Sequence, residues 1–296
     1  MQEAQDIPTS GEFVRPAATR STGISFAPEE NPFSTVFADV THRCNMACHN
    51  CYIPNRDIPD MDADWLAGIL ARLPKRTRIR LVGAEPTVRT DLPDLIRMVR
   101  RLGHIPVILS NGLRLGNRWY VQRLKAAGLR TVHLSLNGGL DDDAYEAIDG
   151  LRCAARKLKA LSNLLDEHYL VTAGMIVVPG VNDRQLGGFY RHLRTMGARE
   201  LHLRSVGAFG RHLEDCAMSL SDLIAVAERE IGISHAEMAE TDDDPQSARH
   251  FVHDGMRIQI TQWPDLGSRT RGRLTPEGRL EPMFEHLMLN AAEGGY

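Results

Sequence analysis

Apolar residues follow two alternating patterns from residue 33 onward. Short apolar runs typical of buried strands are followed by longer segments in which apolar residues recur with helical spacing. In the segment 91–102, for example, Leu92, Leu95, Ile96 and Val99 recur at intervals of three and four residues. The predicted strands span residues 33–40, 78–82, 105–110, 131–136, 169–178 and 200–205. The predicted helices span residues 61–73, 91–102, 119–127, 154–165 and 184–196.

Strands that alternate with helices predict an α/β fold built on a parallel sheet. The six predicted strands are too few for a complete eight-fold barrel, which takes about 250 residues. A partial (β/α)6 TIM-like barrel and an open doubly wound sheet both fit the pattern, and periodicity alone does not separate them. In either architecture, functional residues follow the carboxyl ends of the strands.

The segments on either side of this alternation have a different character. Residues 1–31 are polar without a sustained period, and we expect them to form a loose N-terminal arm. Residues 32–206 contain the predicted core barrel. We expect residues 207–296 to form a C-terminal extension that closes the barrel and contributes to the substrate site. Within the extension, the pattern predicts a helix, a strand and a turn between two short strands at 219–230, 257–261 and 273–280.

The composition narrows the range of functions. The chain has 296 residues, is 43% hydrophobic and carries a formal net charge of -3 with a pI near 6.5. This balance argues against a broad nucleic-acid-binding surface, which needs clustered positive charge. No run approaches the roughly 18 apolar residues of a membrane span, and the acidic start does not resemble a secretory signal. We therefore expect a cytoplasmic protein without nucleic-acid or membrane partners.

The strongest chemical signal is a group of three cysteines. Cys44, Cys48 and Cys51 form a C-x3-C-x2-C motif directly after the first predicted strand, although the whole chain has only five cysteines. Random placement would give this spacing with a probability of about 0.001. Three thiolates on one loop can hold three corners of a [4Fe–4S] cube. The fourth iron then keeps an open coordination position for a substrate or cofactor, as the metal of a catalytic zinc site does.

Other interpretations of the cysteines stay open from the spacing alone. A zinc site would take its fourth ligand from His42 or His49. A cluster that only transfers electrons or senses redox state would recruit Cys153 or Cys216 as a fourth ligand. Three unrelated core thiols are the remaining alternative.

With this motif after the first strand of a predicted partial barrel, residues 34–206 resemble the radical S-adenosylmethionine (SAM) superfamily. The resemblance implies two cofactors, a [4Fe–4S] cluster and SAM, with SAM bound to the open iron. It implies reductive cleavage of SAM to a 5′-deoxyadenosyl radical that abstracts hydrogen from the substrate. We expect the substrate to be a small polar metabolite or a peptide, and the electron donor to be a protein such as flavodoxin or ferredoxin.

Motifs at later strand ends are similar to SAM-binding motifs of this superfamily. The segment 83–86 resembles Gly-Gly-Glu-Pro with Ala84 in place of the second glycine, and 110–112 resembles Thr-Asn-Gly. The segment 135–138 resembles Ser-Leu-Asp-Gly, although Asn137 replaces the acid. The resemblance assigns SAM binding to Asn50, Tyr52, Gly83, Ala84, Glu85, Ser110, Asn111, Ser135, Asn137, Leu203 and Arg204.

The C-terminal third carries few further ligands. Cys216 is the only cysteine after the core barrel, so we predict a single cluster. Arg269, Arg271 and Arg273 occupy alternate positions, and an extended chain would present them on one side toward a carboxylate or phosphate. A solvated charged loop is the alternative. Trp263 is expected to pack across the open side of the barrel.

Overall fold

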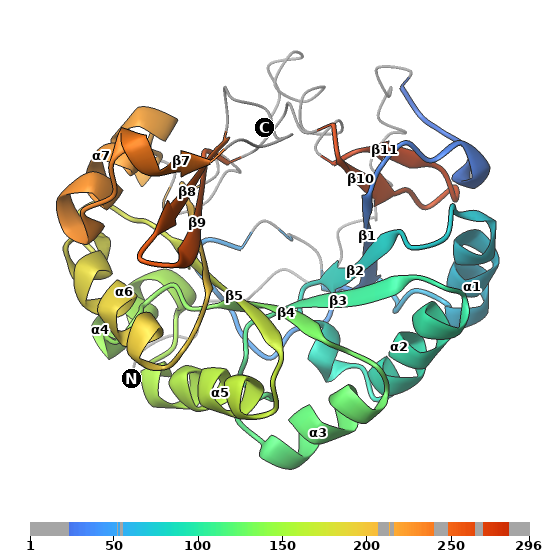
Figure 1. The fold of residues 1–296 in the computed structure, drawn as a ribbon. Helices are drawn as coiled ribbons and strands as arrows, with labels where there is room; N and C mark the ends of the chain where they lie inside the picture. Colours follow the sequence, from blue (N-terminus) through green and yellow to red (C-terminus); the bar gives the residue numbers. More distant parts are fainter. Residues whose placement is uncertain are drawn as a thin grey trace, which may run out of the picture.

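A curved sheet of eleven strands forms the centre of the computed structural model, in the order β11-β10-β1-β2-β3-β4-β5-β6-β9-β8-β7. Figure 1 shows the sheet curled into a partial barrel, with its helices on the outer side. This arrangement confirms the partial TIM-like barrel and excludes the doubly wound sheet, which would carry helices on both faces. The structure describes residues 24–51, 53, 56–206, 213, 216–239, 248–263 and 269–283.

The six predicted core strands all form, and each is parallel to its neighbours. Their side chains are mostly buried because the barrel interior covers one face and the helices cover the other. Parallel pairing brings the carboxyl ends of all six strands to one rim. The strands are β1 (Thr35–Thr41), β2 (Arg78–Gly83), β3 (Ile105–Ser110), β4 (Thr131–Ser135), β5 (Leu170–Ile176) and β6 (Glu200–Arg204).

The helices between the strands pack their apolar stripes on the sheet. In α2, the residues with helical spacing, Leu92, Leu95, Ile96 and Val99, are all buried. None of the described helices has the length and apolar character that crossing a membrane requires. The helices of the core are α1 (Ala63–Arg72), α2 (Leu92–Arg101), α3 (Arg118–Ala126), α4 (Asp142–Asp149), α5 (Ala154–Asp166) and α6 (Leu186–Thr195).

Helix α4 is absent from the sequence-based prediction. It has only eight residues and an acidic first turn, so its apolar period is short. Its ends are nevertheless well defined. The side chain of Asp141 accepts a hydrogen bond from the backbone N–H of Asp143 at 2.8 Å, and Gly150 ends the helix with a φ of 69°.

The C-terminal residues lengthen the sheet at both edges. Strand β9 (Met256–Thr261) lies parallel to β6, and β10 (Arg271–Leu274) lies parallel to β1. An ion pair between Arg273 and Asp39, with Nε 2.8 Å from Oδ2, joins β10 to β1. The other elements of this part are α7 (Leu220–Ile231), β7 (Met238–Ala239), β8 (Ala248–His253) and β11 (Leu280–Pro282).

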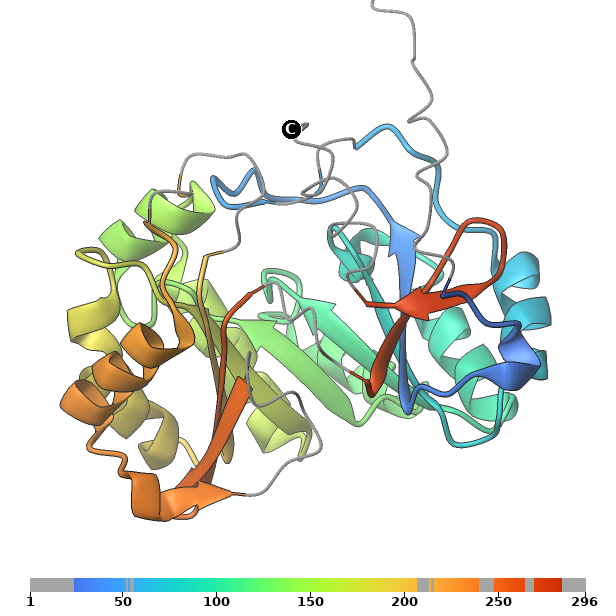
Figure 2. The ribbon, with the colours of Figure 1, turned by 90° about the horizontal axis from the view of Figure 1, so that it is seen from above.

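Strands β7 and β11 form the two free edges of the sheet in the described part of the chain. Figure 2 shows the barrel from above, with the C-terminal strands on its two opposite sides. Closure of the barrel by the extension therefore stays a prediction, as do the boundaries of the three expected regions.

Candidate cofactor site

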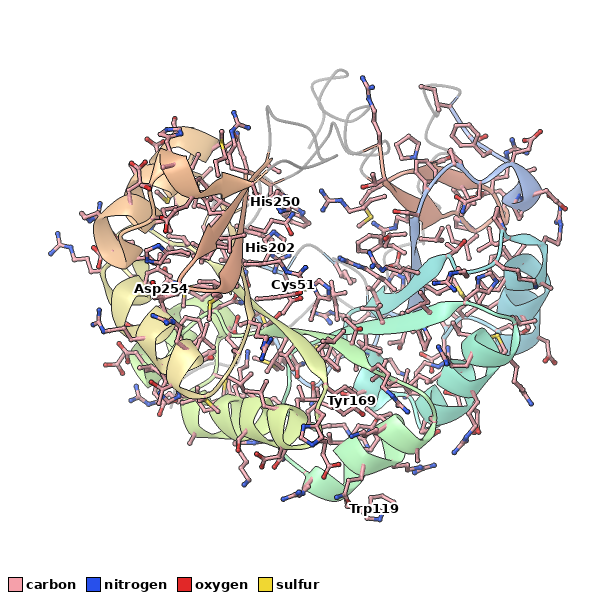
Figure 3. The ribbon with its side chains drawn as sticks, viewed as in Figure 1. Cys51, Trp119, Tyr169, His202, His250 and Asp254 are labelled. Atoms are coloured by element: carbon pink, nitrogen blue, oxygen red, sulfur yellow. The ribbon has the colours of Figure 1, made fainter. Side chains whose placement is uncertain are left out.

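The three cysteines of the motif lie around one cavity at the carboxyl ends of the strands. Cys44, Cys48 and Cys51 are half-buried free thiols, and all three line a hollow of about 950 Å³ that is partly open to solvent. Figure 3 shows Cys51 on the inner side of the curved sheet. The described lining of this cavity includes neither Cys153 nor Cys216.

Three thiols on one cavity are the donor set that a [4Fe–4S] cluster takes from this motif. Among the described residues, no group of three or more His, Cys, Asp or Glu side chains is placed to bind one metal ion. A [4Fe–4S] cube makes no such demand, because each thiolate binds a different iron. Three thiols around one cavity therefore fit the cube.

The chemical environment differs among the thiols. Burial, followed by the negative charge of Asp149, raises the pKa of the Cys48 thiol well above its ordinary value. Metal ligation would remove this proton, because the thiolate is the ligand. At Cys51, Nη2 of Arg56 lies 3.0 Å from Sγ and donates a charged hydrogen bond. Sequence reasoning missed Arg56, which lines the cavity.

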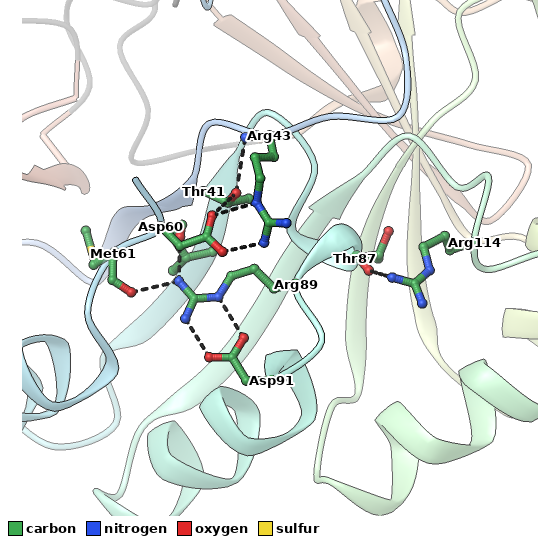
Figure 4. Close-up of polar contacts among 9 residues, drawn as sticks. Thr41, Arg43, Asp60, Met61, Thr87, Arg89, Asp91 and Arg114 are labelled. Atoms are coloured by element: carbon green, nitrogen blue, oxygen red, sulfur yellow. Dashed lines mark hydrogen bonds and ion pairs between the residues drawn. The ribbon is translucent and has the colours of Figure 1, made fainter. Parts of the chain in front are cut away.

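Two anchors hold the cysteine loop in place, and the first is a buried arginine. Arg89 donates from Nη1 to the carbonyl oxygens of Val40 at 2.6 Å and Met61 at 2.8 Å, and its other nitrogens pair with Asp91. The guanidinium therefore joins the end of β1 to the segment that enters α1 (Figure 4). A buried arginine with this many bonds fixes the loop where it leaves the sheet.

A second set of contacts continues this anchor at the beginning of the loop. Oγ1 of Thr41 donates to Oδ1 of Asp60 at 2.6 Å, and Nε of Arg43 donates to the same oxygen at 3.1 Å (Figure 4). The Arg43 side chain is 55% exposed, so its ion pair contributes only about 0–1 kcal/mol. The shared Asp60 mainly orients the residues that precede Cys44.

The other anchor is the end of α4. The backbone N–H of His49 donates to the carbonyl oxygen of Ile148 at 3.1 Å. A Cβ added at Gly150 would lie 2.9 Å from the carbonyl oxygen of Ala47, so the loop approaches the helix end closely. The short helix that the sequence did not predict thus supports the middle of the cysteine motif.

Most of the predicted SAM-binding residues come together around the same cavity. The exceptions are Glu85 and Leu203, whose side chains do not line it, and Tyr52, which lies outside the described residues. Contact with SAM stays a prediction for every residue of the set. The cavity lining includes Asn50, Gly83, Ala84, Ser110, Asn111, Ser135, Asn137 and Arg204.

Glu85 links two loops from inside the protein. Its fully buried carboxylate accepts hydrogen bonds from N and Oγ1 of Thr87, from Oγ of Ser110 at 2.9 Å and from N of Asn111 at 2.6 Å. Burial raises the pKa of this carboxyl, while these hydrogen bonds act in the opposite direction. The adjacent carbonyl of Thr87 accepts from Arg114 (Figure 4). Glu85 therefore positions Ser110 and Asn111 at the cavity.

Gly83 has a direct steric reason for its identity. Its φ is 120°, and an added Cβ would lie 1.9 Å from the carbonyl oxygen of Thr41. The next residue, Ala84, donates from its backbone N–H to the same oxygen at 2.9 Å. The ends of β1 and β2 thus touch through their backbones, which requires glycine at this position.

Leu203 is completely buried, and its strand pairs with β5 and β9 on either side. Its side chain belongs to the main hydrophobic core. Any contact of Leu203 with a cofactor would therefore involve its backbone, which is the contact predicted for it.

A buried ion pair in the cavity wall was missed by the sequence analysis. Nζ of Lys157 lies 2.6 Å from Oδ2 of Asp149, and the two side chains are only 1% and 2% exposed. Asn137 donates to Oδ1 of Asp149 at 2.8 Å, and the ammonium lies 4.8 Å from the ring centroid of Tyr145. The available signal was a lysine on the otherwise apolar face of α5.

A second hollow, of about 760 Å³ including its open part, adjoins the first on the inside of the sheet. Arg204, Ser135 and Trp263 line both hollows. A molecule in the second hollow would therefore lie beside one in the first.

The fold is a partial α/β barrel, and a cavity lined by three cysteines lies at the ends of its strands. The sequence model of the radical SAM superfamily matches residues 39–193, which is 155 of the 296 residues, and the chain belongs to this superfamily. Its members are enzymes that use a [4Fe–4S] cluster and SAM. The predicted family, enzyme class and cofactors are thus confirmed.

The chain is similar to enzymes with different substrates. It is 35% identical over 170 residues to 7,8-dihydro-6-hydroxymethylpterin dimethyltransferase of Methanocaldococcus jannaschii, covering 52% of this chain and 32% of that protein. It is 27% identical over 172 residues to the probable GTP 3',8-cyclase of Pyrococcus abyssi, covering 56% of this chain and 55% of the relative. The chain thus spans about a third of the first relative and just over half of the second.

Two solved structures share the fold at low sequence identity. Streptococcus suis SuiB bound to its precursor peptide SuiA has a TM-score of 0.64 and 16% identity, covering 87% of this chain and 61% of that one. The enzyme anSMEcpe with bound AdoMet has a TM-score of 0.55 and 13% identity, covering 89% and 82%. At these identities the likeness concerns the fold alone.

Proposed function

We propose that this protein cleaves SAM reductively at a [4Fe–4S] cluster held by Cys44, Cys48 and Cys51, and that hydrogen is then abstracted from a substrate beside it. When bound, the cluster and SAM supply a 5′-deoxyadenosyl radical through one-electron cleavage of a C–S bond of the sulfonium. The observation that carries this proposal is the convergence on one cavity of all three cysteines, of Asn50 between them, and of seven predicted SAM-binding residues at the later strand ends.

The chain's own residues have separate tasks in this proposal. The three thiolates hold the cluster, and the Arg56 guanidinium places a positive charge beside the sulfur of Cys51. Glu85 holds Ser110 and Asn111 in position, and the backbone contact at Gly83 shapes the adjacent wall. The surrounding barrel limits the access of water, which protects a radical from side reactions.

The substrate and the electron donor also belong to the proposal. The relatives include enzymes named for a pterin and for GTP, and a structural neighbour is bound to a peptide. They are consistent with either a small polar metabolite or a peptide as substrate. A one-electron reduction needs a protein donor of low potential, for which flavodoxin or ferredoxin is suited. We propose the cytoplasm as the site of the reaction.

Anaerobic reconstitution with iron and sulfide tests this function. The holoprotein with dithionite and SAM should release 5′-deoxyadenosine, measured by liquid chromatography and mass spectrometry. Replacement of Cys44, Cys48 or Cys51 by Ala should remove most of the bound iron and sulfide and abolish this product. Cys216→Ser is the matched control and should retain both.

An intact cluster that yields no 5′-deoxyadenosine would refute the enzymatic proposal. It would favour the alternative of an iron–sulfur protein for electron transfer or redox sensing. Retention of full iron content by the three alanine variants would contradict the ligand assignment. Circular dichroism of each variant separates loss of the ligand from loss of the fold.

A further inference from the structure

The second hollow has an unusual set of charged residues on its walls. Arg80, Arg204 and Arg271 reach it from β2, β6 and β10, which are far apart in the sequence. The described residues that line it include no aspartate or glutamate. Three guanidiniums that converge on one hollow create a positive potential, and enclosure by protein strengthens it relative to bulk water.

Two histidines in the same walls respond to this potential. His133 and His202 line the hollow, and Figure 3 shows His202 on the inner side of the sheet. The pKa of each ring is well below its ordinary value, first because of burial and then because of the nearby arginine charges. Both imidazoles are therefore neutral near pH 7. They can donate or accept hydrogen bonds without adding to the charge.

Other residues that line the hollow suit an apolar or aromatic part of a ligand. Phe37, Trp263 and Met283 line the hollow, and the guanidinium of Arg80 lies 5.0 Å from the ring centroid of Phe37. A site lined by three arginines and by apolar and aromatic side chains suits a molecule with an anionic group on a flat or apolar scaffold. Guanidinium binds phosphate and carboxylate oxygens in a two-pronged geometry that lysine does not offer.

We propose that this hollow is the substrate site and that it takes a small molecule with a phosphate or carboxylate group, bound by Arg80, Arg204 and Arg271. The inference rests on the proposed function for its chemistry, because hydrogen abstraction requires a substrate beside the cofactor. The shared residues Ser135, Arg204 and Trp263 supply that adjacency. The proposed anion site also favours a small anionic metabolite over a peptide as the substrate.

Isothermal titration calorimetry of the reconstituted holoenzyme tests the site with two probes of known chemistry. Inorganic pyrophosphate represents phosphate groups, and citrate represents carboxylates. Binding of either probe should weaken as ionic strength rises. Arg80→Gln and Arg271→Gln should each weaken the probe that binds by about 10- to 100-fold, the loss expected when a charged hydrogen-bond donor is removed.

Arg97→Gln is the matched control, since Arg97 is exposed on α2 and pairs with Asp94. It should bind either probe as the wild type does. Preference for pyrophosphate or for citrate decides which anionic group the substrate carries. If neither probe binds, or if Arg80→Gln and Arg271→Gln bind as tightly as Arg97→Gln, the anion site is refuted.

Release of 5′-deoxyadenosine by the same wild-type preparation is measured alongside the titration. Product without anion binding would refute the substrate site and leave the proposed function standing. Anion binding without product would refute the proposed function and leave an anion site in the barrel.

Discussion

Removing Lys157 should destabilise the protein strongly, because it would leave a carboxylate buried without its counter-charge. Nζ of Lys157 lies 2.6 Å from Oδ2 of Asp149, and both side chains are at most 2% exposed. Breaking a buried pair from one side costs about 3–5 kcal/mol. Since domains are stable by only about 5–15 kcal/mol, Lys157→Met should remove a large part of the free energy of unfolding.

A double-mutant cycle isolates the pair. Asp149→Asn removes the other charge. In the wild type, Nδ2 of Asn137 donates to Oδ1 of Asp149 at 2.8 Å, and the side-chain oxygen that the variant keeps can still accept this hydrogen bond. The double variant Lys157→Met with Asp149→Asn removes both charges of the pair, so we expect it to be more stable than Lys157→Met. The coupling energy should lie near the upper end of the usual 0.5–3 kcal/mol, at about 2 kcal/mol or more.

Urea unfolding of the anaerobic protein, followed by circular dichroism, measures these free energies. Lys159→Met is the matched control, because Lys159 is exposed on the same helix. It should change stability by less than about 0.5 kcal/mol. A loss below about 1 kcal/mol in Lys157→Met, or strictly additive effects in the cycle, would refute the reasoning that this pair depends on burial.

Three other perturbations examine the site. Gly83→Ala would place a methyl group 1.9 Å from the carbonyl oxygen of Thr41, so iron content after reconstitution should fall severalfold, and normal content would contradict the close approach. Glu85→Gln should lower the free energy of unfolding by about 2 kcal/mol, measured in urea, because it weakens buried charged hydrogen bonds. An unchanged midpoint would argue against its linking role. The lowered pKa values of His133 and His202 mean that below about pH 6.5 the unfolded chain binds more protons than the folded one. The free energy of unfolding should therefore fall with decreasing pH, by up to about 1.4 kcal/mol per pH unit for each ring. The double variant His133→Gln with His202→Gln should lose this part of the pH dependence.

The core strands and most of the core helices followed from local pattern. Buried residues were indicated by apolar runs of strand length and by amphipathic stripes such as that of α2. The parallel α/β arrangement follows from the alternation of these two patterns. Helix α4 lay beyond this reasoning, because eight residues with an acidic first turn carry too little periodicity. Its role became visible only in its contacts with Ala47 and His49.

The sequence likewise predicted some features of the candidate site and missed others. The cysteine spacing and the motifs after β2, β3 and β4 were enough to expect one shared cavity, because parallel strands end at one rim. The sequence did not reveal that Glu85 would face inward, or that Arg56 would approach Cys51. Such details depend on side-chain direction within loops, for which no simple period exists.

Local sequence was sufficient for the β/α alternation, for the cysteine loop and for its place at the strand ends. Long-range packing settled which segments extend the sheet: β9 beside β6 and β10 beside β1. With them it brought Arg80, Arg204 and Arg271 to one hollow. The physical reason is that periodicity along a chain encodes burial, whereas the partner of a strand edge or a buried charge is chosen among residues far away in the sequence. Those choices exist only once the sheet has formed.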